Sequence, residues 1–276
     1  MPAGHGTTRA TPRIAACFAR LAERGELGLI VYLTAGDPSP EASERLVLAA
    51  AEAGADAIEL GVPFSDPVAD GPVIQRASER ALRAGTTLAG VLELAARLRQ
   101  QLSIPLIVFS YLNPVFQMGF GEFARRAAAA GVDGVLVTDL PPEEADGYLE
   151  SLAAHGLDPI FLAAPTTTEE RLEAIAARSR GFLYLVSRTG VTGAQRRLPE
   201  DLQDLIRRVR RVSRLPVAVG FGLSEPEHLS ALRGAVEAAV VGSALVALVE
   251  QAGSATEAAS ALADRVRALK RACRAS

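Results

Sequence analysis

The pattern that decides the fold is visible in one stretch, Ala57-Ile-Glu-Leu-Gly-Val-Pro-Phe-Ser-Asp-Pro-Val-Ala-Asp-Gly71. The stretch begins with a short apolar run, continues as a loop rich in proline and glycine, and is followed by a helix-like segment over Val73–Ala84. A continuous apolar run, unlike an alternating one, is typical of a parallel strand that is buried on both faces. The stretch therefore predicts one βα unit of an α/β protein.

Runs of the same kind recur along the chain, and helix-like segments separate them. The eight runs are Leu29–Leu33, Ala57–Leu60, Leu106–Phe109, Gly134–Val137, Pro159–Leu162, Phe182–Val186, Val217–Val219 and Ala238–Val241. Eight such strands in a chain of this length favour a single closed (β/α)₈ TIM barrel, for which about 250 residues are typical. We expect two short helices in addition to those of the barrel, one at the N-terminus and one that binds phosphate after the eighth strand. An open doubly wound sheet is the alternative that the pattern leaves open.

Composition limits the class of protein. The 276 residues carry a net charge of −3, with 49% apolar and 22% charged residues. Such a chain can bury a large core, and it offers no basic field to nucleic acid or to an anionic membrane. Residues 1–12 lack the apolar segment of a signal peptide, and no run reaches the roughly 20 residues of a membrane-spanning helix. We therefore expect a flexible tail over residues 1–12, a catalytic barrel domain over residues 13–276 and a cytoplasmic location.

Several kinds of chemistry lack the side chains they need. Lys270 is the single lysine, and its place near the C-terminus suits Schiff-base catalysis badly. Cys17 and Cys273 have the spacing of neither a disulfide framework nor a zinc site, and the three histidines form no ligand cluster. Dinucleotide, P-loop and serine-hydrolase motifs are also missing. We expect no metal.

Two carboxylates frame the loop after the second run. Glu59 lies within the apolar run, where loss of hydration raises the pKa of a carboxyl and suits it to acid–base work. Asp70 lies near the end of the loop, between glycine hinges at Gly61 and Gly71. Two carboxylates in different surroundings can take separate acid and base roles. An ion pair with a loop arginine is the alternative for Glu59, and we interpret Asp66 as a turn residue.

Glycine-rich pieces follow the last three runs and predict a phosphate site. They are Gly190–Gly193, Gly220–Ser224 and the pair Gly242-Ser243, which opens the segment Ala244–Glu250. The phosphate site of a TIM barrel often uses these loops and the N-terminus of a short extra helix. Backbone amides there hold an anion without a lysine, and Ser243 can add a hydroxyl donor as well as capping the helix. A tight turn is the alternative for each piece taken alone.

Five strings of residues resemble the tryptophan synthase α subunit. They are Tyr32–Pro38, Glu59–Pro72, Tyr111–Pro114, Ser187–Gly193 and Gly220–Gly222. The resemblance implies a carbon–carbon lyase that performs the retro-aldol cleavage of indole-3-glycerol phosphate to indole and glyceraldehyde 3-phosphate, with no cofactor in this subunit. It also implies a partner, the pyridoxal-phosphate-dependent β subunit, which uses the indole for tryptophan synthesis in an α₂β₂ complex. The loop around Asp66 and Pro67 and the segment Tyr111–Phe120 are the expected contact surface.

The same resemblance assigns roles to residues. Glu59 is expected to move protons at C3 of the indole and at the glycerol hydroxyl, while Asp70 hydrogen-bonds the indole nitrogen. The other expected site residues are Gly193, Gly222, Gly242 and Ser243 at the phosphate, Tyr184 beside Glu59, Thr192 on a loop that closes over the substrate, and Tyr32, Leu60 and Phe221 around the indole. The pair Phe109-Ser110 departs from the residues usual in the family at the pocket wall.

Three other functions stay open at this point. A different phosphate-binding barrel, such as a sugar-phosphate isomerase, epimerase or aldolase, would need a strand lysine or histidine ligands, which are missing. A catalytically dead barrel that only activates a partner is disfavoured because both Glu59 and Asp70 are present. A free-standing lyase that releases indole differs only in lacking the β subunit.

Overall fold

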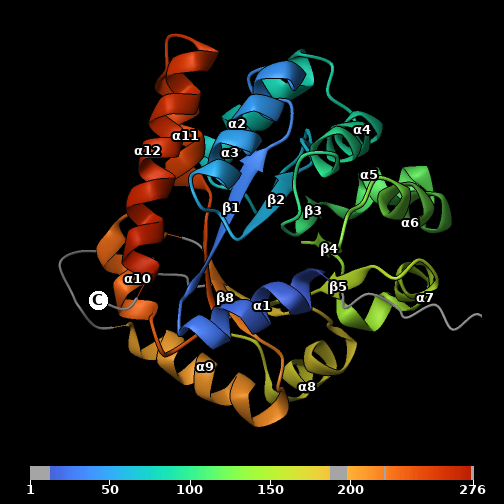
Figure 1. Ribbon diagram of the computed structural model, residues 1–276. Coiled ribbons are helices and arrows are strands. Elements are labelled where there is room, and N and C mark those ends of the chain that lie inside the picture. Colours follow the sequence, from blue (N-terminus) through green and yellow to red (C-terminus); the bar gives the residue numbers. More distant parts are fainter. Residues whose placement is uncertain (1–12, 187–197, 221, 275–276) are drawn as a thin grey trace, which may run out of the picture.

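The structure is a computed structural model that describes residues 13–186, 198–220 and 222–274. Within these residues the strands form one parallel sheet in the order β5-β4-β3-β2-β1-β9-β8-β7-β6 (Figure 1). The strands are β1 Gly28–Thr34, β2 Ala57–Gly61, β3 Leu106–Ser110, β4 Gly134–Val137, β5 Asp158–Ile160, β6 Leu162–Ala163, β7 Leu183–Val186, β8 Val217–Gly220 and β9 Ala238–Val241.

The two ends of this sheet belong to one stretch of chain. β5 pairs with β4 and β6 pairs with β7, and only Phe161 separates β5 from β6. Phe161 itself accepts a hydrogen bond from the Tyr184 amide at 3.2 Å. Because β5 and β6 together occupy one strand position, the nine strands close into an eight-stranded barrel. This closure confirms the (β/α)₈ TIM barrel and rules out the open sheet.

Helices surround the strands (Figure 1). They are α1 Arg13–Arg24, α2 Pro40–Glu52, α3 Pro72–Arg83, α4 Leu88–Arg99, α5 Leu112–Met118, α6 Phe120–Ala129, α7 Asp146–Ala154, α8 Glu169–Arg178, α9 Glu200–Val212, α10 Pro226–Leu232, α11 Ser243–Gln251 and α12 Ala255–Cys273, with a 3-10 turn at Pro142–Glu144. The expected extra helices are α1, before the first strand, and α11, directly after the last. Pro40, Pro72 and Pro226 each open a helix, where the missing amide proton costs little.

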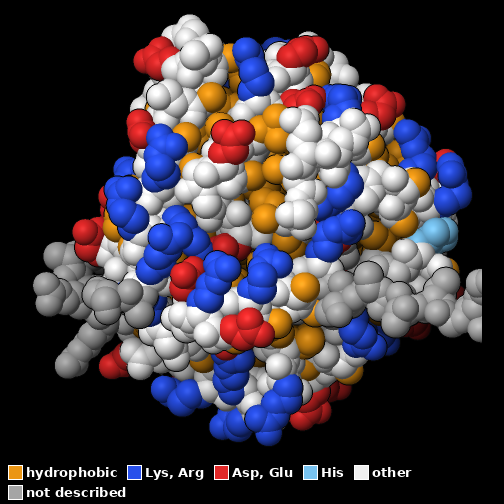
Figure 2. Space-filling view, viewed as in Figure 1, with side chains coloured by type: hydrophobic (Ala, Val, Ile, Leu, Met, Phe, Trp, Pro, Cys, Tyr) orange, Lys and Arg blue, Asp and Glu red, His pale blue; other side chains and the backbone are white. Residues whose placement is uncertain are grey.

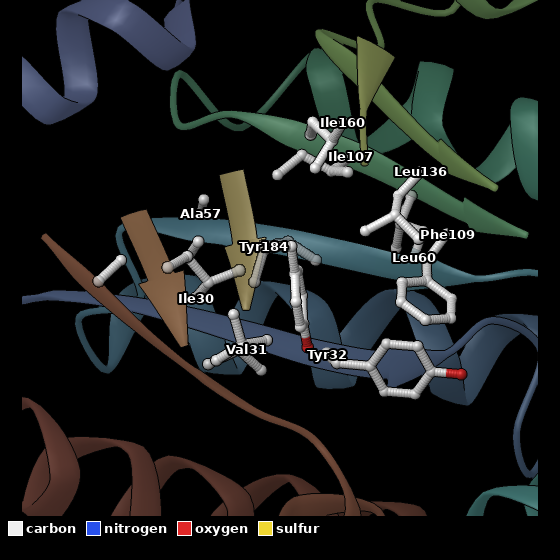
Figure 3. Close-up of a cluster of buried hydrophobic side chains, with 14 of the residues drawn as sticks. Ile30, Val31, Tyr32, Ala57, Leu60, Ile107, Phe109, Leu136, Ile160 and Tyr184 are labelled. Carbon is white, nitrogen blue, oxygen red and sulfur yellow. The ribbon is translucent and has the colours of Figure 1, made fainter. Parts of the chain in front are cut away.

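The inside of the barrel is a packed core. Alternate residues of each strand point inward, so side chains from different strands fill this space; Ile107 of β3 and Ile160 of β5 lie side by side there (Figure 3). Charged side chains of both signs cover the outer face seen in Figure 2. Within the described residues, no helix has the combination of length and apolarity that crossing a bilayer requires.

The amino ends of the strands are sealed. Helix α1 packs Ile14 against Gly134 at this end of the barrel. The contact is so close that a Cβ on Gly134 would lie 2.9 Å from the Ile14 Cδ1. Beside it, the Lys270 Nζ lies 2.7 Å from Asp56 Oδ2 and 3.3 Å from Glu26 Oε2. The lone lysine is thus a buried structural cation at this end, and active sites of TIM barrels form at the opposite end, where the strands have their carboxyl ends.

Candidate functional site

A cavity of about 460 Å³ opens at the carboxyl ends of the strands. The predicted site residues that line it are Tyr32 and Tyr184 from the strands, Asp70 from the loop after β2, Gly222 after β8, and Gly242 and Ser243 at the start of α11. Residues predicted from separate loops therefore meet around one cavity. A larger hollow of about 660 Å³ near α8 contains none of the predicted site residues, and it borders Val186, after which residues 187–197 lie outside the described chain.

Glu59 is completely buried on β2, paired in register with the cavity-lining Tyr32, and is not itself among the residues that line the cavity. Its side chain is 0% exposed, and neither carboxylate oxygen has a hydrogen-bond partner among the described residues. Burial raises the pKa of Glu59 from its ordinary value of 4.5 to about 8. The charge of Glu59 in turn contributes to raising the pKa of Tyr32 and of Tyr184, so the carboxyl lies within electrostatic reach of both cavity-lining phenols. An ion pair with a loop arginine is not found among the described residues.

Asp70 lies at the cavity wall, where its side chain is less buried than that of Glu59. Burial raises its pKa from 3.8 to about 6, and a hydrogen bond from the Tyr111 side chain opposes the rise. The Tyr111 hydroxyl also accepts a hydrogen bond from the Ala69 amide at 3.0 Å, and Gln75 Nε2 donates to the Asp70 carbonyl at 2.8 Å. Tyr111 and α3 therefore fix the backbone that carries Asp70. Asp66 is exposed, and its carboxylate accepts a hydrogen bond from the Ser65 hydroxyl at 2.5 Å, away from the cavity.

Two glycines give the cavity tyrosines their space. A Cβ on Gly61 would overlap the Tyr32 hydroxyl, and a Cβ on Gly220 would overlap the Tyr184 hydroxyl. The Tyr32 ring also meets Phe109 nearly edge-on, with ring centroids 5.3 Å apart at 80° (Figure 3). Phe109, where the sequence departs from the family pattern, is thus a wall of the cavity together with Tyr32.

Some predicted residues do not reach the cavity or cannot be placed. Leu60 follows Glu59 on β2, so it points to the opposite face of the sheet. It is fully buried there and is not among the cavity-lining residues. Thr192, Gly193 and Phe221 lie outside the described residues.

Two of the residues predicted to bind phosphate, Gly242 and Ser243, lie at the start of α11. The helix begins at Ser243, and Gly242 is its N-cap residue without a side-chain capping bond, so Ser243 is the first residue of the helix and not its cap. The first amides of a helix have no partner within it and point outward from its positive end, which favours an anion. Gly222 enters the same cavity with φ +72°, a conformation that favours glycine. Within the described part of the chain, no three His, Cys, Asp or Glu side chains are grouped closely enough for a metal ion.

Tyr111 and Phe109 are functional candidates that the residue pattern did not single out. The sequence placed Tyr111 in one of the family strings and in the expected contact segment Tyr111–Phe120, and it placed Phe109 in a strand run and as a departure from the family pattern; neither was named for the catalytic pocket. Their positions depend on contacts with a loop and a strand that are distant in the sequence. The one local signal is that both lie at the carboxyl end of β3, the end where barrel active sites form.

Comparison with known proteins assigns the family. The family model described as tryptophan synthase alpha chain matches residues 18–274. The tryptophan synthase alpha chain of Solibacter usitatus is 55% identical over 239 residues, which is 87% of this chain and 90% of that protein. That of Carboxydothermus hydrogenoformans is 50% identical over 238 residues, 86% of this chain and 89% of that protein. A structure of Mycobacterium tuberculosis tryptophan synthase matches with a TM-score of 0.88 at 37% identity, covering 96% of this chain and 100% of that chain. The chain described here therefore belongs to the tryptophan synthase alpha chain family.

Proposed function

We propose that Glu59 and Asp70 perform the acid–base steps with which this alpha chain cleaves indole-3-glycerol phosphate to indole and glyceraldehyde 3-phosphate. The observation that carries the proposal is the buried Glu59 carboxyl, which has no hydrogen-bond partner among the described residues. It lies within electrostatic reach of Tyr32 and Tyr184, two tyrosines that line the cavity together with Asp70. A pKa of about 8 keeps Glu59 protonated at neutral pH, whereas a pKa of about 6 leaves Asp70 ionised. Opposite protonation states let the two carboxylates take different roles.

The chemistry then runs in two proton transfers. Protonated Glu59 gives its proton to C3 of the indole, and ionised Asp70 accepts a hydrogen bond from the indole N–H while positive charge develops on that nitrogen. The Glu59 carboxylate next removes the proton of the glycerol hydroxyl. The electrons of the carbon–carbon bond return to the indole ring, the released carbon becomes an aldehyde, and Glu59 is protonated again.

The substrate phosphate anchors the other end of the molecule. We assign this role to the amides at Gly222, Gly242 and Ser243, together with Gly193, because the first three meet at the positive end of α11. Tyr32 and Phe221 would border the indole, Tyr184 would orient Glu59, and Thr192 would belong to the loop that closes over the substrate. A ligand held by its phosphate would then present its scissile bond above Glu59.

Exchange of each carboxyl for an amide tests these roles. Glu59→Gln is expected to lower turnover by a factor on the order of 10² to 10⁴, the usual contribution of a general acid or base, with little change in phosphate affinity. Asp70→Asn is expected to lose most turnover as well, whereas Asp66→Asn, a matched control in the same loop, keeps it. Indole release by the purified variants is the measurement. Near-normal turnover in Glu59→Gln would remove Glu59 from the mechanism.

The indole passes to the β subunit of tryptophan synthase for tryptophan synthesis. We propose that this partner contacts the rim around Asp66, Pro67 and the segment Tyr111–Phe120. Two large apolar side chains in these segments support the assignment, because Val68 is 86% and Phe116 is 63% exposed. Phe116→Asp should weaken co-purification with the β subunit while the isolated chain keeps its lyase activity, and unchanged association would contradict this surface.

We further propose that the reaction at this subunit needs no cofactor and takes place in the cytoplasm. Lys270 is the only lysine, and its pairing with Asp56 at the far end of the barrel leaves no amine for a Schiff base at the cavity. Cys17 and Cys273 are free, buried thiols, as expected in a reducing compartment. Activity that survives exhaustive dialysis against a chelator, with no added cofactor, is the expected result.

A further inference from the structure

Four charged side chains connect α3, α11 and the loop after β1. Arg80 Nε and Nη2 donate hydrogen bonds to the two carboxylate oxygens of Asp37 at 2.8 and 2.9 Å, and its Nη1 donates to Glu250 Oε1 at 2.8 Å. Arg76 Nε and Nη2 donate to the two oxygens of Glu250 at 2.7 and 2.8 Å. We call Asp37, Arg76, Arg80 and Glu250 the rim clamp.

The rim clamp differs from an ordinary surface ion pair in geometry and burial. Both acidic groups bind an arginine through two parallel hydrogen bonds, the arrangement with the highest directional specificity. Asp37 is only 3% exposed, so its charge depends on Arg80 for compensation. Hydrogen bonds from Arg76, and then those from Arg80, hold the pKa of Glu250 down near 2. Glu250 therefore stays ionised and paired with both arginines at neutral pH, whereas burial raises the pKa of Asp37 and the hydrogen bonds from Arg80 oppose that rise.

The clamped elements are those that form the cavity. Helix α3 begins at Pro72, two residues after Asp70, and α11 begins at Ser243. The first turns of both helices line the cavity, and the two helices pack on each other (Figure 1). Gln75 of α3 also holds the Asp70 carbonyl. A shift of α11 along α3 would therefore change the distance between the start of α11 and the catalytic carboxylate.

We propose that the rim clamp is a positioning device that fixes the start of α11 relative to Asp70; this inference rests on the proposed function. None of its four side chains lines the cavity. When Glu250 loses its charge, the amides at the start of α11 still bind phosphate, because they belong to the helix itself. What is lost is the alignment of the anchored phosphate with the carboxylates, and a misplacement of about 1 Å can cost on the order of 100-fold in rate.

Glu250→Gln, with Glu44→Gln as the matched control, tests the rim clamp. Glu44 accepts a hydrogen bond from Arg97 at 2.7 Å, and its side chain is 24% exposed, close to the 26% of Glu250. The Glu44–Arg97 pair joins α2 to α4, away from the cavity. Glu250→Gln should lower kcat for indole-3-glycerol phosphate about tenfold while the Kd for inorganic phosphate stays within about twofold of the parent. Glu44→Gln should change neither value by more than about twofold.

Two results would overturn the inference. Unchanged kcat in Glu250→Gln would show that the clamp does not position the site, and a parallel loss of phosphate affinity would show a merely structural role for α11. Asp37→Asn, which frees Arg80 from the loop after β1, should also lower kcat at unchanged phosphate affinity. If the Asp37→Asn protein does not fold, the result for Glu250→Gln decides alone. Failure of the proposed function would show separately, as turnover that persists in Glu59→Gln.

Discussion

The buried Glu59 carboxyl should make this protein less stable as the pH rises. The pKa is about 8 in the folded chain and 4.5 as its ordinary value, which we take for the unfolded chain. Below pH 4.5 the carboxyl is neutral in both states and contributes nothing. Between pH 4.5 and 8 the unfolded chain releases the proton while the folded chain keeps it, so ionisation favours unfolding. Above pH 8 the carboxyl is ionised in both states and the loss of stability is complete.

The size of the effect follows from the width of the interval. One pKa unit is worth about 1.4 kcal/mol, so the loss is about 3 kcal/mol at pH 7 and on the order of 5 kcal/mol above pH 8. Glutamine has nearly the same shape as a neutral carboxylic acid and does not titrate. Glu59→Gln should therefore be less than about 1 kcal/mol more stable than the parent at pH 5, and about 3 kcal/mol more stable at pH 7.

Urea unfolding of both proteins at pH 5, 6, 7, 8 and 9, at constant ionic strength, measures this difference. Every other titrating group is shared, so its contribution cancels in the comparison between the two proteins. The free energy difference should rise with pH and level off above pH 8. A difference that stays constant with pH would show that the Glu59 carboxyl ionises normally in the folded protein, and the acid–base role proposed for it would lose its basis.

Three further predictions concern activity and stability. The pH profile of kcat/KM should be bell-shaped, falling below about pH 6 as Asp70 gains a proton and above about pH 8 as Glu59 loses one. In Asp70→Asn the residual activity should no longer fall at acid pH; a fall that persists would be due to the substrate phosphate and would contradict the assignment. Gly61→Ala should lower kcat/KM at least about tenfold, because the added Cβ would overlap the Tyr32 hydroxyl and ring and force the ring into the cavity. Tyr32→Leu in the same chain, which removes the overlapping ring atoms, should restore part of the activity; no recovery would refute the steric cause. Lys270→Met should lower the free energy of unfolding by about 3 kcal/mol, because two partly buried carboxylates lose their cation, and it should leave kcat unchanged; reduced kcat at unchanged stability in urea would contradict this.

Much of the fold could be predicted because its signal is local. Each apolar run is set by the burial of a parallel strand on both faces, so the run Ala57–Leu60 is readable without its neighbours. The run Pro159–Leu162 was likewise recognised, although the structure divides it into β5 and β6 at Phe161. Closure of the barrel depends on pairing between these two short strands and their neighbours, and only the tertiary structure shows that pairing.

The candidate site divides in the same way. Glu59 and Asp70 could be proposed from sequence because both lie in one continuous strand–loop unit, so their proximity follows from chain connectivity. Leu60 shows the limit of a resemblance, because the alternation of side chains along β2 turns it away from the cavity. Phe109 and Tyr111 became visible only when β3 was seen beside β1 and the loop after β2.

By itself, the sequence determined the strand–helix alternation and the family, and it was enough to propose the two carboxylates, since each is encoded in residues that are neighbours in the chain. The tertiary structure alone decided that Glu59 is sealed from water and that Arg80 binds both Asp37 and Glu250, which are 43 and 170 residues away from it in the chain. Desolvation and ion pairing depend on what surrounds a group in three dimensions, and short sequence patterns carry no record of contacts between residues so far apart.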